Sequence, residues 1–201
     1  MLNITAPTTV RPVTIARLLE RQGSPLAPLA EEIYDLAIAY RVDAAFALAQ
    51  WMVESQLGCL PLAQEHRNAA LVRVALTRLA APAAVGAPAL PILPPRYGDT
   101  AGSGYVCYPS WLAGLEEYFR LLRCVFVDAR REEQVAQIAQ AYLATTPGRR
   151  ASPPAAKRHA RKGARHAAPQ GKAPAPPPIS QQEIATYARR IELYRAAFQV
   201  V

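Results

Sequence analysis

Apolar residues recur every three to four positions along most of the chain, a pattern typical of amphipathic helices. Ala, Leu and Val are more frequent than β-branched runs, which also favours helices. Asp43 and Ser110 have the short polar side chains preferred at helix N-caps, and Gly58 suits a helix end. The pattern predicts helices over residues 11–22, 29–41, 44–58, part of 60–80, 110–124, 131–144 and 181–198.

Residues 81–109 break this helical pattern. Pro and Gly recur through the stretch APAAVGAPALPILPPRYGDTAGSGYVCYP, so no long helix is expected there. The GYVCY run at 104–108 could form a short strand. We therefore predict a mainly α fold with one small irregular or β-containing excursion in the middle of the chain.

The chain is long and apolar enough for one substantial core, with 201 residues of which 51% are hydrophobic. No run of about 18 apolar residues is present, so no membrane span is expected. The N-terminal stretch MLNITAPTTVRPVTIARLL has no early basic region followed by an apolar core, and it does not resemble a secretory signal.

The positive net charge comes from a single segment. Of the 23 basic residues, eight lie in residues 147–178, so that 15 basic and 15 acidic residues remain elsewhere. The segment is rich in Pro and Ala, has no acid, and should be disordered because it has little apolar bulk to bury. Its basic residues could bind anionic wall polymers, with nucleic acid as a less favoured alternative. They are Arg149, Arg150, Lys157, Arg158, Arg161, Lys162, Arg165 and Lys172.

One acid, Glu54, lies in the otherwise apolar stretch ALAQWMVESQLG at 47–58. A buried carboxylate is costly unless it is solvated, paired or neutral, and the negative end of the helix dipole adds to that cost. Both effects raise a pKa. A carboxylic acid that stays protonated near neutral pH is what a glycosidase uses to protonate a leaving sugar oxygen. The simpler alternative is a surface residue on the last turn of a core helix.

Four segments in order resemble the glucosaminidase-type peptidoglycan hydrolases, glycoside hydrolase family 73. They are ALAQWMVESQLGCLPLAQEHRNAALVR, YPSWLAGLEEYFRLL, ATTP and YARRIELY, which together reach from about residue 31 to 198. The positions that fit the family signature in the first segment are Ala47, Ala49, Glu54, Ser55, Gly58, Leu62, Ala63 and Asn68. The resemblance implies a lysozyme-like α+β domain whose cleft lies beside the excursion, with Glu54 at its floor.

The sequence departs from the family pattern around the site. Leu143 occupies the position where the family usually has a Tyr before A-T-D-P, and Tyr142 comes one position earlier. Thr146 replaces the Asp of that motif, and Arg73 replaces a Lys that usually follows the Asn. A long insertion separates ATTP from YARRIELY. The expected organisation is one domain formed by residues 1–147 and 179–201, with a disordered basic insertion at 148–178.

Hydrolysis of a glycoside usually needs a second group besides the acid. Asp99, in the Gly-rich part of the excursion, is the first candidate for a base, although an Asp next to Gly is also common in turns. Glu65 is the second candidate. Glu116 and Glu117 lie on a predicted helix and are expected to be solvated.

Several further residues are candidates for contacts with the sugar. Tyr142 is assigned to the catalytic residues together with Glu54 and Asp99. Tyr142 and Tyr105 could orient the substrate, or could simply be packing residues. Asn68 could bind an N-acetyl group, or could cap a helix. Tyr108 and Trp111 belong to the second matched segment and are expected at the substrate site.

No cofactor or metal is expected. The three histidines are scattered, and Cys59, Cys107 and Cys124 lack a CxxC spacing. The cysteines are expected to be small buried residues, with one disulfide as an alternative.

The resulting hypothesis is an endo-β-N-acetylglucosaminidase of the cell wall, outside the cytoplasm, with Glu54 as general acid. The missing signal leaves cytoplasmic action or a non-standard export route open. The alternatives are a wall-binding module of the same fold without turnover and a nucleic-acid-associated protein acting through the basic segment.

Overall fold

The computed structural model describes residues 3–74, 76, 104–129, 134–144 and 179–199. This part is mainly helical, as the sequence predicts. The α-helices are α1 (Pro12–Arg21), α2 (Ala30–Tyr40), α3 (Ala44–Ser55), α4 (Pro61–His66), α6 (Trp111–Arg120), α7 (Val135–Ala144) and α8 (Gln181–Gln199). A 3-10 turn η1 (Ala27–Leu29) leads into α2, and a π-helix η2 (Leu121–Ala129) continues α6.

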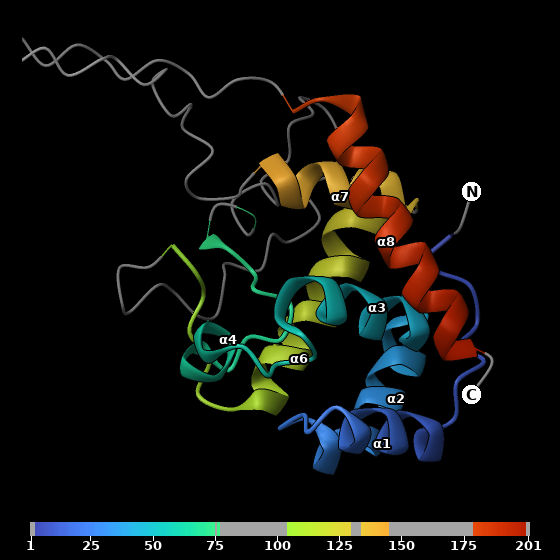
Figure 1. Cartoon of the computed structure of the whole chain (residues 1–201), viewed down its shortest axis with the longest axis vertical. Coiled ribbons are helices and arrows are strands. Elements are labelled where there is room, and N and C mark those ends of the chain that lie inside the picture. The colour runs from blue at the N-terminus through green and yellow to red at the C-terminus, as the bar shows by residue number, and fades with distance from the viewer. Residues whose placement is uncertain (1–2, 75, 77–103, 130–133, 145–178, 200–201) are drawn as a thin grey trace, which may run out of the picture.

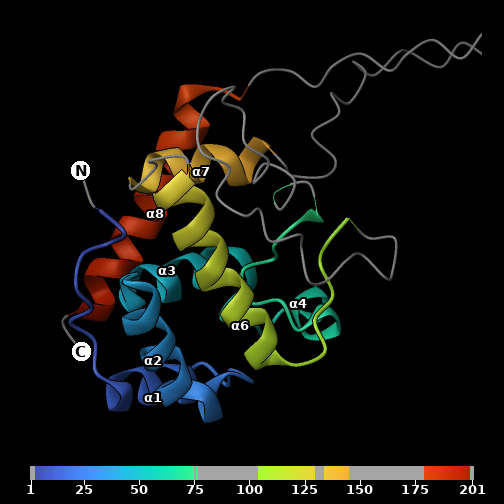
Figure 2. The ribbon, with the colours of Figure 1, turned by 180° about the vertical axis from the view of Figure 1, so that it is seen from behind.

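Helix α3 lies at the centre of the molecule. Figure 1 shows α8 crossing over α3 and α7, and Figure 2 shows α6 on the opposite side of α3. Nine of the 12 residues of α3 are buried, because its sequence AAFALAQWMVES is apolar on nearly every face. A helix that is apolar all round needs neighbours on all sides, and α3 finds them in α2, α6 and α8.

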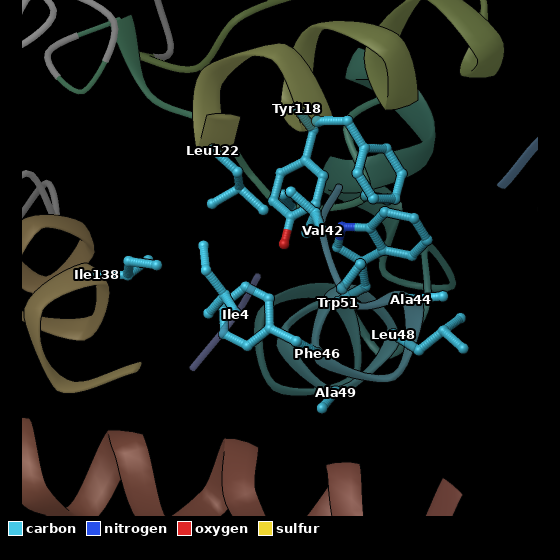
Figure 3. Packing of buried hydrophobic residues seen from close by; sticks show 14 of the residues in the cluster. Ile4, Val42, Ala44, Phe46, Leu48, Ala49, Trp51, Tyr118, Leu122 and Ile138 are labelled. Carbon is cyan, nitrogen blue, oxygen red and sulfur yellow. The ribbon is translucent and has the colours of Figure 1, made fainter. Parts of the chain in front are cut away.

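The aromatic part of the core forms where α6 packs against α3. Trp51 of α3 meets Tyr118 and Phe119 of α6 edge to face, with ring centroids 5.3 and 6.0 Å apart. Figure 3 shows the rings of Trp51 and Tyr118 above Phe46 and Leu48. Such T-shaped contacts place the positive edge of one ring against the negative face of another. This cluster fixes the position of α3, and therefore of the acid at its C-terminal end.

Both predicted N-caps are confirmed. The Asp43 carboxylate accepts a hydrogen bond from the Ala45 amide at 3.1 Å, and the Ser110 hydroxyl accepts one from the Ala113 amide at 3.1 Å. Each side chain satisfies an amide that has no partner within its helix.

The predicted C-terminal ends were less accurate. Helix α3 ends at Ser55 rather than at Gly58, because Gln56 and Leu57 already have left-handed backbone angles, with φ of 52° and 57°. The helix after Ser110 is regular only to Arg120. Residues 60–80 are helical in part, as predicted, with α4 over six residues, and residues 77–80 lie outside the described residues.

Two expectations about side chains were wrong. Glu117 is buried rather than solvated, because Arg120 one turn later donates two hydrogen bonds to its carboxylate. The three cysteines are free thiols, with Cys59 and Cys107 half-buried and Cys124 exposed.

The excursion contributes a short antiparallel contact. Arg73 and Tyr105 form an isolated β-bridge, flanked by hydrogen bonds from Val74 to Gly104 and from Val106 to Val72. GYVCY therefore has a pairing partner, although within the described ranges it forms no longer strand. Residues 77–103, which include Asp99, and the basic segment 148–178 lie outside the described residues.

Among the described residues, no single helix is long and apolar enough to cross a membrane. One pair of helical segments, Ala27–Tyr40 and Ala44–Ser55, meets the length and composition requirements only when the two are counted together, and the chain bends by 119° between them. The second half of that pair is the core helix α3.

Candidate functional site

The site begins at the abrupt end of α3. The Ser55 hydroxyl shares its one proton between the Ala69 and Trp51 carbonyls and accepts from the Gly58 amide at 2.8 Å. Gly58 has a φ of 82°, and a side chain there would press against the Trp111 ring. The Glu-Ser-x-x-Gly pattern thus has a local reason, since Ser55 and Gly58 turn the chain immediately after Glu54.

Glu54 is almost enclosed, with its side chain 9% exposed. The Tyr187 hydroxyl on α8 donates a hydrogen bond to Glu54 Oε1, and Arg73 Nη2 lies 3.8 Å from Oε2. Burial raises the pKa of the Glu54 carboxyl, and the Tyr187 hydrogen bond and the charges of Arg73 and Arg190 only partly oppose this rise. The geometry favours a carboxyl group that keeps its proton to higher pH than a solvated one.

Contacts with Tyr142 and Tyr105 hold the Arg73 side chain in place. Its Nη1 donates to the Tyr142 backbone carbonyl at 2.8 Å, and its guanidinium lies 5.5 Å from the centre of the Tyr105 ring. These contacts hold the guanidinium with its Nη2 3.8 Å from Glu54 Oε2. Its charge therefore acts on Glu54 from outside hydrogen-bond range.

Three tyrosines of three different helices surround the acid. Burial raises the pKa of Tyr118, Tyr142 and Tyr187 well above the ordinary value, and the charge of Glu54 adds to the rise in each. These phenols are therefore neutral near pH 7, where they act as neutral hydrogen-bonding groups.

A shallow pocket of about 370 Å³ opens beside Tyr187. It lies at the end of α7 and the start of α8, and its lining residues are Leu143, Ser180, Gln182, Glu183, Thr186, Tyr187 and Arg190. Glu183 serves a structural purpose there, because its carboxylate accepts from the amide and the hydroxyl of Ser180 in a capping box. Tyr187 is thus the group that links this pocket to Glu54.

The structure brings two of the predicted residues close to Glu54. The buried ring of Tyr142 is near enough for the Glu54 charge to act on its pKa. Tyr105 reaches the site through Arg73, which lies against both its ring and Glu54.

The other predicted contacts are more distant or occupied. The Asn68 side chain donates to the Val72 and Val106 carbonyls and accepts from the Val72 amide, all within 2.9 Å. It is also only 1% exposed, so it holds the loop together and is not accessible to a sugar. Tyr108 is buried against Gly114. Trp111 is half-buried and packs on Gly58, which leaves it at the edge of the site.

Sequence reasoning missed Gln50 and Tyr187 as site residues. Both were hidden within an apolar helix pattern, where a tyrosine or a single amide is taken for core packing. A signal was present for Gln50, because a lone amide among AAFALAQWMV must find hydrogen-bond partners once it is buried. No pattern local to α8 could have indicated that Tyr187 faces a residue 133 positions away.

Comparisons with protein-family models, curated proteins and solved structures give no match for this chain. Within the described residues, no group of three or more His, Cys, Asp or Glu side chains is placed to bind a metal ion. Function must therefore be inferred from the chemistry of Glu54 and its neighbours.

Proposed function

We propose that this protein is a glycoside hydrolase of the lysozyme-like α+β type that cleaves the β-1,4 bond after N-acetylglucosamine in peptidoglycan. The observation that carries the proposal is the enclosed Glu54 carboxyl at the C-terminal end of α3, with its raised pKa. The resemblance of the four segments to glycoside hydrolase family 73 supplies the substrate class. The bridge between Arg73 and Tyr105 is consistent with a small β-containing part beside the site.

In this reaction, Glu54 is the general acid. Its proton passes to the glycosidic oxygen as the bond from the anomeric carbon to that oxygen breaks, and the bonding electron pair leaves with the oxygen. A raised pKa keeps the acid protonated before the step. Asp99 is the proposed second group, which would activate the water that attacks the anomeric carbon.

Replacement of Glu54 by Gln tests the proposal. Glu54→Gln keeps the shape of the side chain and its acceptor for Tyr187 but cannot supply a proton, so digestion of purified cell walls should slow by about a hundredfold or more. Glu20→Gln is the matched control, because Glu20 is an exposed acid of α1 with no proposed role and should leave the rate unchanged. A folded Glu54→Gln protein with near-full activity would exclude this acid.

A second candidate is a wall-binding module of the same fold without turnover. It is favoured by the tight enclosure of Glu54 and by Leu143, which brings no hydroxyl to the pocket that it shares with Tyr187. In such a module, wild type and the Glu54→Gln variant would bind walls equally well, and neither would release muropeptides. The wall-digestion assay therefore separates the two candidates.

The basic segment supports a wall location for either candidate. Its eight Lys and Arg residues without an acid would attract phosphate and carboxylate groups of wall polymers. Removal of residues 148–178 should weaken wall binding and reduce its salt dependence. If the deletion instead abolishes nucleic-acid binding in a gel-shift assay and leaves wall binding unchanged, the segment is a nucleic-acid-binding segment.

A further inference from the structure

A chain of hydrogen bonds, buried at its α6 end and part-buried at Tyr187, reaches Glu54 from α6. The Tyr118 hydroxyl donates to Gln50 Oε1 at 2.7 Å, and Gln50 Nε2 makes a longer contact of 3.5 Å with the Tyr187 hydroxyl oxygen. Tyr187 then donates to Glu54 Oε1. Three helices contribute to this relay, which consists of Tyr118, Gln50 and Tyr187.

The direction of the relay follows from the number of protons available. A tyrosine has one hydroxyl proton, and an ionised carboxylate can only accept. Tyr187 must therefore give its proton to Glu54, so its own oxygen is left to accept from the Gln50 amide. Gln50 must in turn direct its carbonyl oxygen toward Tyr118, which is the orientation found.

The two oxygens of Glu54 consequently have different surroundings. Oε1 accepts a hydrogen bond from the neutral Tyr187 hydroxyl. The nearest charged group to Oε2 among the described residues is Arg73 at 3.8 Å, beyond hydrogen-bond range. A proton that arrives at the carboxyl group meets an occupied Oε1 and an Oε2 without a bound hydrogen. Oε2 is therefore the atom on which the proton resides.

We propose that Tyr187 and Gln50 are positioning residues that hold Glu54 by Oε1 and assign the transferable proton to Oε2. The last step of this inference, transfer of that proton from Oε2 to the leaving sugar oxygen, rests on the proposed function. The hydrogen-bonding part does not. The inference also explains how Leu143 can be tolerated, because Tyr187 brings a hydroxyl to the same pocket from α8.

The test is a carbon-13 NMR titration of the Glu54 carboxyl in protein labelled at Glu side chains. Glu54→Gln identifies the resonance by its loss. Tyr187→Phe removes only the hydroxyl that stabilises the ionised form, so the pKa of Glu54 should be higher than in wild type. Gln50→Leu should shift it in the same direction by less. Tyr194→Phe, a tyrosine two turns further along α8 that stacks on Phe198, is the matched control and should leave it unchanged.

An unchanged Glu54 titration in Tyr187→Phe would overturn the inference. Wall digestion provides a separate measurement, because in Tyr187→Phe the alkaline limb of the pH profile should move to higher pH and the maximal rate should fall about tenfold or more. If the titration shifts while wild type digests no walls, the positioning of Glu54 stands and the proposed hydrolase function fails.

Discussion

The two ends of α3 each present a buried carboxylate to α8, and the two are held very differently. At the N-terminal end, Asp43 makes an ion pair with Arg195 at 2.6 Å and also caps the helix. At the C-terminal end, Glu54 has an arginine, Arg73, only at 3.8 Å and accepts a hydrogen bond from the neutral Tyr187. The helix dipole stabilises a negative charge at the first end and opposes it at the second.

Under the proposed function, this difference separates a structural acid from a catalytic one. Burial raises the pKa of both carboxyl groups, but for Asp43 the Arg195 charge and two backbone amides oppose that rise directly. Asp43 is therefore an acid whose charge is matched by an arginine in direct contact. Glu54 instead has its nearest described arginine beyond hydrogen-bond range, an arrangement that suits the proposed acid.

The largest effect is expected at the N-terminal end. Arg195→Met should destabilise the protein by about 3–5 kcal/mol, because it leaves the Asp43 charge buried without its partner. Urea unfolding measures this change. Arg189→Met, an exposed arginine on the same helix, is the control and should alter stability by less than about 0.5 kcal/mol. Equal effects of the two substitutions would show that the ion pair is not structural.

A change of opposite sign is expected at the C-terminal end. Glu54→Gln should stabilise the protein by about 1 kcal/mol at pH 8, because it replaces a poorly matched buried charge with a neutral acceptor for Tyr187. The same urea titration measures the gain. A loss of stability would show that Glu54 is a structural anion like Asp43.

The gain from Glu54→Gln should depend on pH with a defined sign. Burial raises the folded pKa of Glu54 above its ordinary value of 4.5, so between these two values the folded protein binds more protons than the unfolded chain. Wild-type stability contributed by this group therefore falls as pH rises through that window. The advantage of Glu54→Gln should grow across the same window and level off above it, which unfolding curves from about pH 4 to pH 8 would show. A pH-independent difference would contradict the raised pKa.

The smallest effect concerns the turn after Glu54. Gln56 is exposed and has a left-handed backbone, which glycine adopts without strain. Gln56→Gly should stabilise the protein by less than about 1 kcal/mol, whereas Leu57→Gly, at a buried position, should destabilise it by about 2–5 kcal/mol. Thermal unfolding compares the two, and a clear loss for Gln56→Gly would show that its side chain matters at this end of α3.

Much of the helical fold could be predicted from the sequence because it is encoded locally. The N-caps Asp43 and Ser110 need only a short polar side chain before an apolar run, and both are present in the structure. The end of α3 lies earlier than predicted, since a sequence does not show that Gln56 and Leu57 accept left-handed angles for the sake of tertiary contacts.

The site was predictable only as far as Glu54. A single acid in an apolar helix is a visible conflict between burial and charge. Tyr187 and Arg195 resemble any other members of a helix face, and their importance arises only when α8 packs across α3. Long-range partners of this kind follow from the tertiary arrangement, so no local pattern reveals them.

The most direct test of the central claim is mass spectrometry of the products released from purified peptidoglycan. We expect muropeptides with N-acetylglucosamine at the reducing end from wild type, the same products from Glu20→Gln, and essentially none from Glu54→Gln. Products with N-acetylmuramic acid at the reducing end would contradict the proposed bond. Equal release by Glu54→Gln would contradict the proposed acid.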